Sequence, residues 1–137
     1  MNMPYVCPCC KVIPTSHSLK KVAEKNGMVY YYTCPSQARM YYDAPSIVQH
    51  YKGVLSEEKT DWVWIFDSRG FTFEHAIQTT VAIELAKLLS TFNHLTKIII
   101  LNPTMYITAT YHLVRPFLHQ LIEMNHASTW EDLMFQY

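Results

Sequence analysis

The sequence predicts a small three-layer α/β domain, in which helices flank a mainly parallel sheet. Two continuous apolar runs, at residues 62–66 and 98–101, are typical of strands that are buried on both faces. After each run, apolar residues recur at spacings of three and four, as they do along one face of a helix. This alternation of strands and helices favours a parallel sheet with right-handed crossovers.

Length and composition narrow the class of protein. A chain of 137 residues is long enough for one domain, and its 50% hydrophobic and 16% charged residues exclude disorder. Eleven basic residues balance eleven acidic ones, so no bulk positive charge is available for nucleic acid. With three glycines the chain has no glycine-rich phosphate loop. We find no secretory leader and no membrane-length apolar run, so we expect a cytoplasmic protein without stable membrane insertion.

The first third of the chain begins irregularly. We expect no regular structure there beyond one or two helical turns in residues 16–26. Residues 28–33 are rich in β-formers and predict a strand. Asp43 is suited to cap a helix over 44–52, with Gly53 just past its end.

The central part of the chain predicts a strand, a helix and a second strand. A charged loop over 56–61 leads into the apolar strand at 62–66. Thr72 is suited to cap a helix whose apolar period runs from 73 to 92. A second buried strand follows at 97–101.

The last part of the chain predicts one long helix over 106–125. Pro116 lies inside it and should kink it, because proline lacks an N–H and clashes with the preceding turn. Ser128 or Thr129 is suited to cap a last short helix.

Three motifs occur in a particular order in the second half of the chain. They are Asp67-x-x-Gly70 after an apolar strand, then Ile98-Ile99-Ile100-Leu101-Asn102-Pro103, then Val114-Arg115-Pro116-Phe117-Leu118. Together they resemble the CRAL-TRIO (Sec14-like) lipid-binding domain, with residues 28–61 as a weaker match to its preceding elements. The resemblance extends to the BCH-type domains, which are protein-interaction scaffolds.

The chain departs from that family at both ends. Family members continue after the Pro-Phe-Leu helix with a strand and a helix that gates the lipid pocket. A helix reaching residue 125 leaves only a short end for these elements. We therefore expect a truncated, minimal CRAL-TRIO-like domain over 28–137, preceded by a Cys-rich extension over 1–27. We also expect no enclosed lipid, because bulky side chains of the two buried strands should fill the remaining space.

The extension carries a candidate metal site. Cys7 and Cys10 form a C-x-x-C pair, whose two thiolates can meet one tetrahedral Zn²⁺. His17 and Cys34 are the nearest further donors, so we predict a structural zinc site from Cys7, Cys10, His17 and Cys34, with Cys9 as an alternate ligand. The alternative is a set of free or mispaired thiols.

Two further interpretations of cysteines and polar residues stay open. The Cys7–Cys10 segment resembles the C-P-x-C of glutaredoxin-like enzymes, although Pro14 interrupts the helix that a redox motif needs. Asp67, Arg69, Asn102 and Thr104 could converge where open α/β sheets bind ligands. We favour the alternative that Asp67 and Asn102 only cap the loops that follow them.

The histidines give no catalytic pattern. His112, His119 and His126 recur every seven residues, whereas metal-binding pairs on a helix stand four apart, so a half-exposed stripe is expected. No Ser-His-Asp grouping or paired catalytic carboxylates are apparent. We therefore predict a protein that is not an enzyme.

The expected function is that of a non-catalytic binding or scaffolding module that acts through protein–protein contacts. Its partners should include a second copy of itself, because zero net charge and exposed sheet edges favour a homodimer. A lipid-binding module of the CRAL-TRIO type is the first alternative. A thiol redox protein that uses Cys7 and Cys10 is the second.

Overall fold

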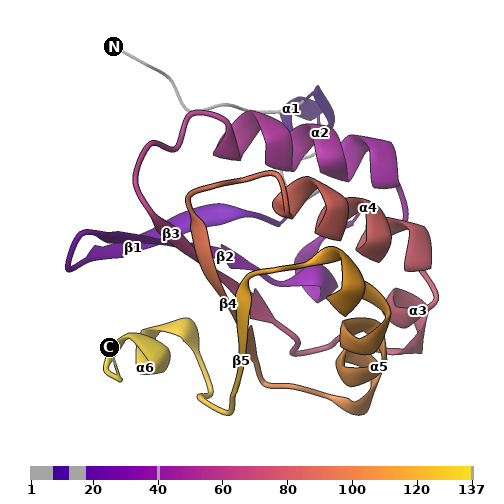
Figure 1. The fold of residues 1–137 in the computed structure, drawn as a ribbon. Coiled ribbons are helices and arrows are strands. Elements are labelled where there is room, and N and C mark those ends of the chain that lie inside the picture. Colours follow the sequence, from indigo (N-terminus) through magenta and orange to yellow (C-terminus); the bar gives the residue numbers. More distant parts are fainter. Residues whose placement is uncertain (1–7, 13–17, 40, 137) are drawn as a thin grey trace.

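A five-stranded sheet forms the centre of the computed structural model, which describes residues 8–12, 18–39 and 41–136 (Figure 1). The strands are β1 (Lys20–Lys25), β2 (Met28–Thr33), β3 (Trp62–Asp67), β4 (Leu95–Leu101) and β5 (Leu121–Asn125). They lie side by side in chain order, with β2 to β5 parallel and β1 antiparallel to β2. The predicted α/β class with a mainly parallel sheet is confirmed.

The antiparallel strand β1 corrects the expectation of helical turns in residues 16–26. Asn26 and Gly27 both have positive φ angles, 55° and 77°, and they join β1 directly to β2. Asn-Gly is the preferred pair for such a two-residue hairpin turn, since both residues tolerate the left-handed region. Part of the predicted extension over 1–27 therefore pairs with the sheet.

The helices connect the strands. They are α1 (Pro8–Val12), α2 (Ala44–Leu55), α3 (Phe73–Ala76), α4 (Thr79–Leu89), α5 (Met105–Val114) and α6 (Trp130–Met134), with short 3₁₀ turns at Pro35–Gln37 and Arg115–Phe117. Asp43 caps α2 as predicted, because its side chain accepts a hydrogen bond from the Ser46 N–H, but the helix continues past Gly53 to Leu55. The helix predicted over 73–92 is divided into α3 and α4.

The long helix predicted over 106–125 is wrong in its second half. α5 ends at Val114, and Pro116 lies in a 3₁₀ turn rather than at a kink. The proline cannot donate to the preceding turn, so the backbone becomes extended at Leu118 and continues as β5. A strand therefore follows the Pro-Phe-Leu segment, which corrects the expectation that only a short end remains there.

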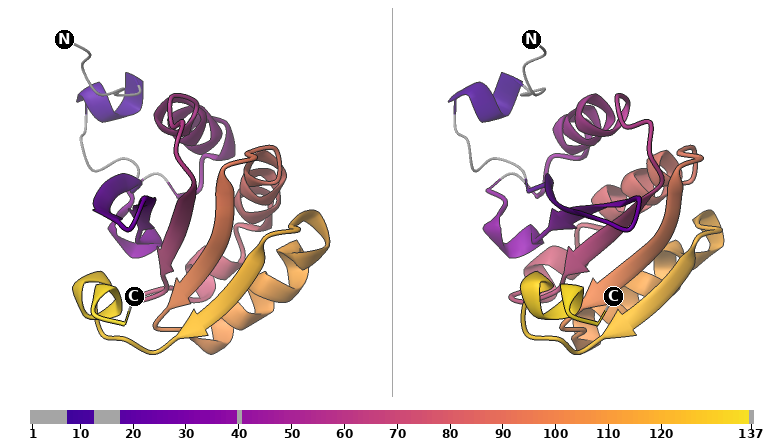
Figure 2. Two further views of the ribbon diagram at one scale, coloured as in Figure 1. Left: turned by 60° about the vertical axis from the view of Figure 1, so that its left-hand side comes forward. Right: turned by 90° about the vertical axis from the view of Figure 1, so that its left-hand side faces the viewer.

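Helices cover the two faces of the sheet unequally (Figure 2). Helices α2, α4 and α5 pack against one face, where Trp62, Trp64 and Phe66 project from β3. The alternate β3 residues, Val63 and Ile65, project from the opposite face into a cluster with Leu133 of α6. The predicted burial of β3 on both faces is confirmed, and Thr129, one of the two predicted cap residues, caps α6.

Candidate functional site

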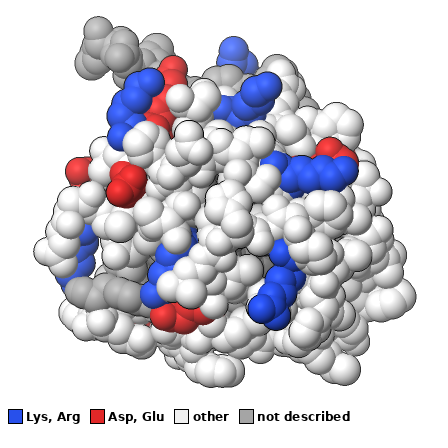
Figure 3. All heavy atoms as spheres, viewed as in Figure 1, with Lys and Arg blue, Asp and Glu red and all other residues white. Residues whose placement is uncertain are grey.

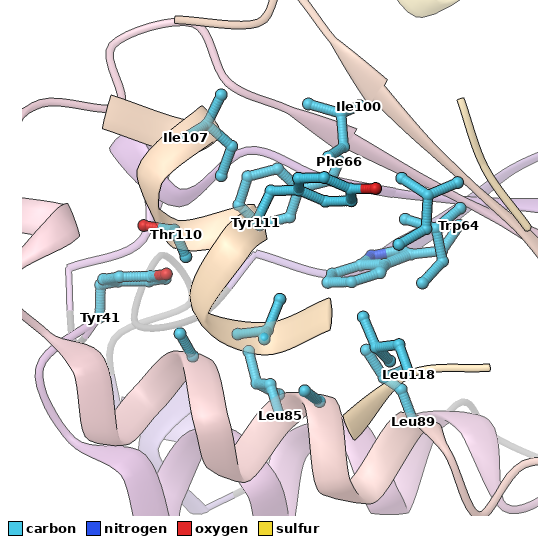
Figure 4. A pocket seen from close by; sticks show the side chains of 15 residues that line it. Tyr41, Trp64, Phe66, Leu85, Leu89, Ile100, Ile107, Thr110, Tyr111 and Leu118 are labelled. Atoms are coloured by element: carbon cyan, nitrogen blue, oxygen red, sulfur yellow. The ribbon is translucent and has the colours of Figure 1, made fainter. Parts of the chain in front are cut away.

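An apolar pocket lies between the sheet and the helices α4 and α5. Its empty volume is about 530 Å³, including the space at its open mouth. Trp64 and Phe66 of β3 and Ile100 of β4 form the wall on the sheet side. Figure 4 shows Leu85 and Leu89 of α4 and Tyr111 of α5 around the same space.

Small residues on α4 create much of this space. Ala82 and Ala86 stand four apart, on the same helical face as Leu85 and Leu89, and all four line the pocket. A methyl group reaches far less deeply toward the sheet than a leucine does. The bulky side chains of β3 and β4 consequently line the pocket without filling it.

Two polar groups of the pocket wall have hydrogen-bond partners within the protein. The Trp64 Nε1–H donates to Thr33 Oγ1 at 2.9 Å, and the Thr110 hydroxyl donates to the Tyr106 carbonyl at 3.2 Å. Burial raises the pKa of the Tyr41 hydroxyl, which keeps this residue neutral. No lining residue carries a formal charge. The pocket therefore suits an uncharged, mainly hydrocarbon ligand.

A polar cluster lies at the carboxyl ends of the strands, on the second face of the sheet. Asp67 accepts hydrogen bonds from the Tyr32 hydroxyl at 2.6 Å, from the Arg69 backbone N–H at 3.0 Å and from the Asn102 amide at 3.2 Å. The side chains of Arg69 and Asn102 also donate to the carbonyl of Ser128, just before α6. The cluster therefore holds loops and α6 in place.

The convergence considered for Asp67, Arg69, Asn102 and Thr104 occurs for three of the four residues. The hydroxyl of Thr104 instead accepts a hydrogen bond from the Ile107 N–H and caps α5. The loop-capping interpretation agrees with these contacts, since the carboxylate of Asp67 is occupied by donors of the protein itself.

The predicted zinc ligands are only partly within the described structure. Cys7 and His17 lie outside the described residues. The Cys34 sulfur lies 3.2 Å from Ser36 Oγ and 3.7 Å from the Arg69 carbonyl oxygen. The Cys10 sulfur lies 3.7 Å from Nδ1 of His50. Over the residues that the structure describes, no three His, Cys, Asp or Glu side chains are grouped so as to hold a metal.

His50 is the residue that sequence reasoning missed. It is a buried histidine on the inner part of α2, forty positions after Cys10. No spacing in the sequence predicts the contact between His50 and Cys10, because the contact arises only when α1 packs near α2. The three histidines expected in one stripe are separated: His112 lies in α5, whereas His119 and His126 lie on either side of β5.

Lys and Arg are scattered over the face seen in Figure 3 rather than gathered into a patch. Among the described residues, no helix combines the length and the apolar character needed to cross a bilayer.

Two comparisons with known proteins found no match. A scan against protein-family models gave no match for this chain, and a search of curated proteins gave none either.

Proposed function

We propose that this protein is a non-catalytic binding module that takes one apolar chain or ring system in the pocket between the sheet and α4 and α5. The pocket itself carries the proposal. Its wall is mainly hydrocarbon and carries no formal charge, as in sites that bind uncharged small molecules. The sequence resemblance to CRAL-TRIO domains, which bind lipids, supports the same class of ligand.

The size of the pocket limits the ligand. Burial of hydrocarbon contributes about 0.8 kcal/mol per CH₂, so a ligand gains affinity only along the part that the walls enclose. The volume of about 530 Å³ includes open solvent, so the walls enclose less space than this, and they hold one tail or ring system more readily than the two tails of a phospholipid. A small apolar ligand therefore fits this site better than a phospholipid.

Nile red is a suitable uncharged probe for this proposal. We expect saturable fluorescence enhancement with the full chain, and competition by a single-chain fatty alcohol. Ala82→Leu and Ala86→Leu add bulk inside the pocket and should each weaken Nile red binding by about tenfold or more, as loss of a few buried CH₂ contacts implies.

Ala109→Leu is the matched control, because Ala109 is an exposed residue of α5 that does not line the pocket. It should leave Nile red binding unchanged. Equal binding by the control and by the two pocket variants, or the absence of saturable binding, would contradict the proposal.

A second candidate function is a protein–protein contact with a second copy of the chain. Exposed apolar side chains favour it: Phe73 of α3 is 61% exposed, and Met105 in the first turn of α5 is 78% exposed. These two helices pack against each other. A formal net charge of zero removes the repulsion that would keep copies apart.

Light scattering at micromolar concentrations tests this second candidate. We expect a mass of about twice the 16.0 kDa of one chain, and a shift toward the monomer in the double variant Phe73→Glu, Met105→Lys. A wild-type protein that stays monomeric throughout would contradict self-association and leave the pocket proposal untouched.

A further inference from the structure

The hydroxyl of Tyr41 is a polar group in the wall of the apolar pocket. Tyr41 lies shortly before α2 and lines the pocket. Figure 4 shows its side chain pointing from the edge of the pocket toward the centre, on the opposite side from Trp64 and Leu118. Within the described part of the chain, no donor or acceptor lies within hydrogen-bonding distance of this hydroxyl. The Tyr41 hydroxyl is therefore available to a ligand.

The packing of the Tyr41 ring fixes the direction of its hydroxyl. The ring meets Phe71 edge to face, with centroids 6.1 Å apart, and it meets His75 in the same way at 5.4 Å. Burial raises the pKa of the Tyr41 hydroxyl, because the ionised form would lose its hydration. Tyr41 consequently keeps its proton at neutral pH and can donate it in a hydrogen bond.

Other polar groups of the pocket wall are less suited to bind a ligand. The Thr110 hydroxyl donates to a backbone carbonyl of α5 at 3.2 Å, and the Trp64 Nε1–H donates to Thr33 at 2.9 Å. Neither group has a proton left for a ligand. Tyr111 also brings a hydroxyl to the pocket, but its ring lies 5.9 Å from the guanidinium carbon of Arg115, an exposed residue. This contact places the Tyr111 ring near the protein surface.

We propose that the ligand of the apolar pocket is an uncharged amphiphile, a single hydrocarbon chain that ends in a hydroxyl group, and that the Tyr41 hydroxyl binds this group. The inference rests on the proposed function of the pocket and adds the polar end of the ligand. A charged end is disfavoured, because no lining residue carries a charge to pair with it. A pure hydrocarbon is disfavoured as well, because it would cover the Tyr41 hydroxyl without offering it a partner.

Displacement of Nile red by 1-octanol and by 1-chlorooctane tests the proposal. The two compounds have the same chain, but the chlorine atom cannot donate a hydrogen bond. Tyr41→Phe removes the hydroxyl and keeps the ring that contacts Phe71 and His75. The preference for the alcohol over the chloride should fall by about three- to tenfold in Tyr41→Phe, as loss of one hydrogen bond implies. Each displacement is corrected for the affinity of that variant for Nile red.

Two conservative variants are the controls. Tyr42→Phe changes the neighbouring tyrosine, which is 64% exposed and does not line the pocket, and Tyr111→Phe changes the other tyrosine of the pocket wall. Both should keep the wild-type preference for the alcohol. An unchanged preference in Tyr41→Phe, or an equal fall in Tyr111→Phe, would overturn the inference.

A comparison within the wild-type protein keeps the proposal testable if Tyr41→Phe does not fold. Octanoate at neutral pH should displace Nile red less effectively than 1-octanol by about tenfold or more, because its charge would be buried without a partner. Equal displacement by octanoate and 1-octanol would overturn the inference and leave the apolar pocket as proposed. The absence of saturable Nile red binding would contradict the proposed function itself, and this inference with it.

Discussion

The Tyr32 hydroxyl donates a hydrogen bond to Oδ2 of Asp67 at 2.6 Å and ties the end of β2 to the end of β3. Oδ1 of the same carboxylate accepts the backbone N–H of Arg69 and the side-chain amide of Asn102. Asp67 is 2% exposed, so its charge is stabilised by these donors rather than by water. One carboxylate thereby orders the loops after β3 and β4.

Tyr32→Phe removes one of these donors and should lower the free energy of unfolding by about 1.5–3 kcal/mol, the usual value for a hydrogen bond to a charged group. Urea denaturation measures the change. Tyr30→Phe is the control, since Tyr30 lies on the same strand and face and its hydroxyl has no hydrogen bond within the described part of the chain. An equal loss in both variants would contradict a specific role for the Tyr32–Asp67 bond.

Thr33→Val keeps the shape of the side chain and removes its hydroxyl. The Trp64 Nε1–H then loses its acceptor in a buried position, whereas the Tyr51 hydroxyl retains the Ser18 carbonyl. We expect a loss of about 1–3 kcal/mol in the free energy of unfolding, the cost of one unsatisfied buried donor. Thr108→Val, at an exposed threonine of α5, should change stability far less. Near-equal denaturation midpoints for the two variants would refute the assignment.

Two glycines with nearly the same backbone conformation should differ in their tolerance of alanine. Gly27 and Gly70 have φ angles of 77° and 75°, which cost a residue with a Cβ about 1–2 kcal/mol. A Cβ at Gly27 meets nothing within 4 Å, whereas one at Gly70 would lie 2.7 Å from the Cβ of Ser36. Gly70→Ala should therefore destabilise the protein by clearly more than Gly27→Ala in thermal denaturation. The reverse order would show that the loop containing Ser36 yields to the added methyl group.

Alkaline pH should destabilise the protein through its buried tyrosines. Burial raises the pKa above the ordinary value of 10.0 for the hydroxyls of Tyr31, Tyr32, Tyr41 and Tyr51. Above pH 10.0 the unfolded chain loses these protons while the folded protein keeps them, so the free energy of unfolding falls as the pH rises. Each such tyrosine contributes a slope of about 1.4 kcal/mol per pH unit.

Urea denaturation at a series of pH values up to about pH 11 measures this slope. In Tyr51→Phe the slope should be shallower by about the contribution of one tyrosine. Phenolate absorbance should show that one tyrosine fewer ionises when the protein unfolds. Tyr42→Phe, which changes a tyrosine that is 64% exposed, is the control and should leave the slope unchanged. An unchanged slope in Tyr51→Phe would contradict the inferred burial effect.

The strands that the sequence predicts are those whose own residues carry a strong signal. β3 is a continuous apolar run and β2 is rich in tyrosine and valine, so both were identified within about a residue of their bounds. β1 and β5 contain lysine, glutamate, leucine and methionine, which favour helices. These two strands form because each pairs with the edge of a neighbouring strand. That pairing depends on the tertiary structure and not on the local sequence. The Asn26–Gly27 turn was the overlooked local signal for β1.

The candidate sites were less predictable than the fold for a physical reason. A pocket is space that side chains leave unfilled, and no sequence motif predicts it. This pocket depends on how Ala82 and Ala86 face the sheet. The meeting of Cys10 with His50 depends on how α1 packs near α2. The sequence allowed the convergence of Asp67 with Asn102, because neighbouring parallel strands end at the same edge of a sheet, although it favoured loop capping by each residue.

The agreement between chain order and strand order has a consequence for synthesis on the ribosome. Because each strand pairs with the one made just before it, the sheet can grow outward from the β1–β2 hairpin as the chain emerges. No later segment has to insert between strands already paired. Leu133 of α6, which packs over Ile65 and Ile99, is made after all five strands, so the second face stays uncovered until residue 133 has left the ribosome. Nascent chains halted before residue 130 should therefore associate with holding chaperones through that face.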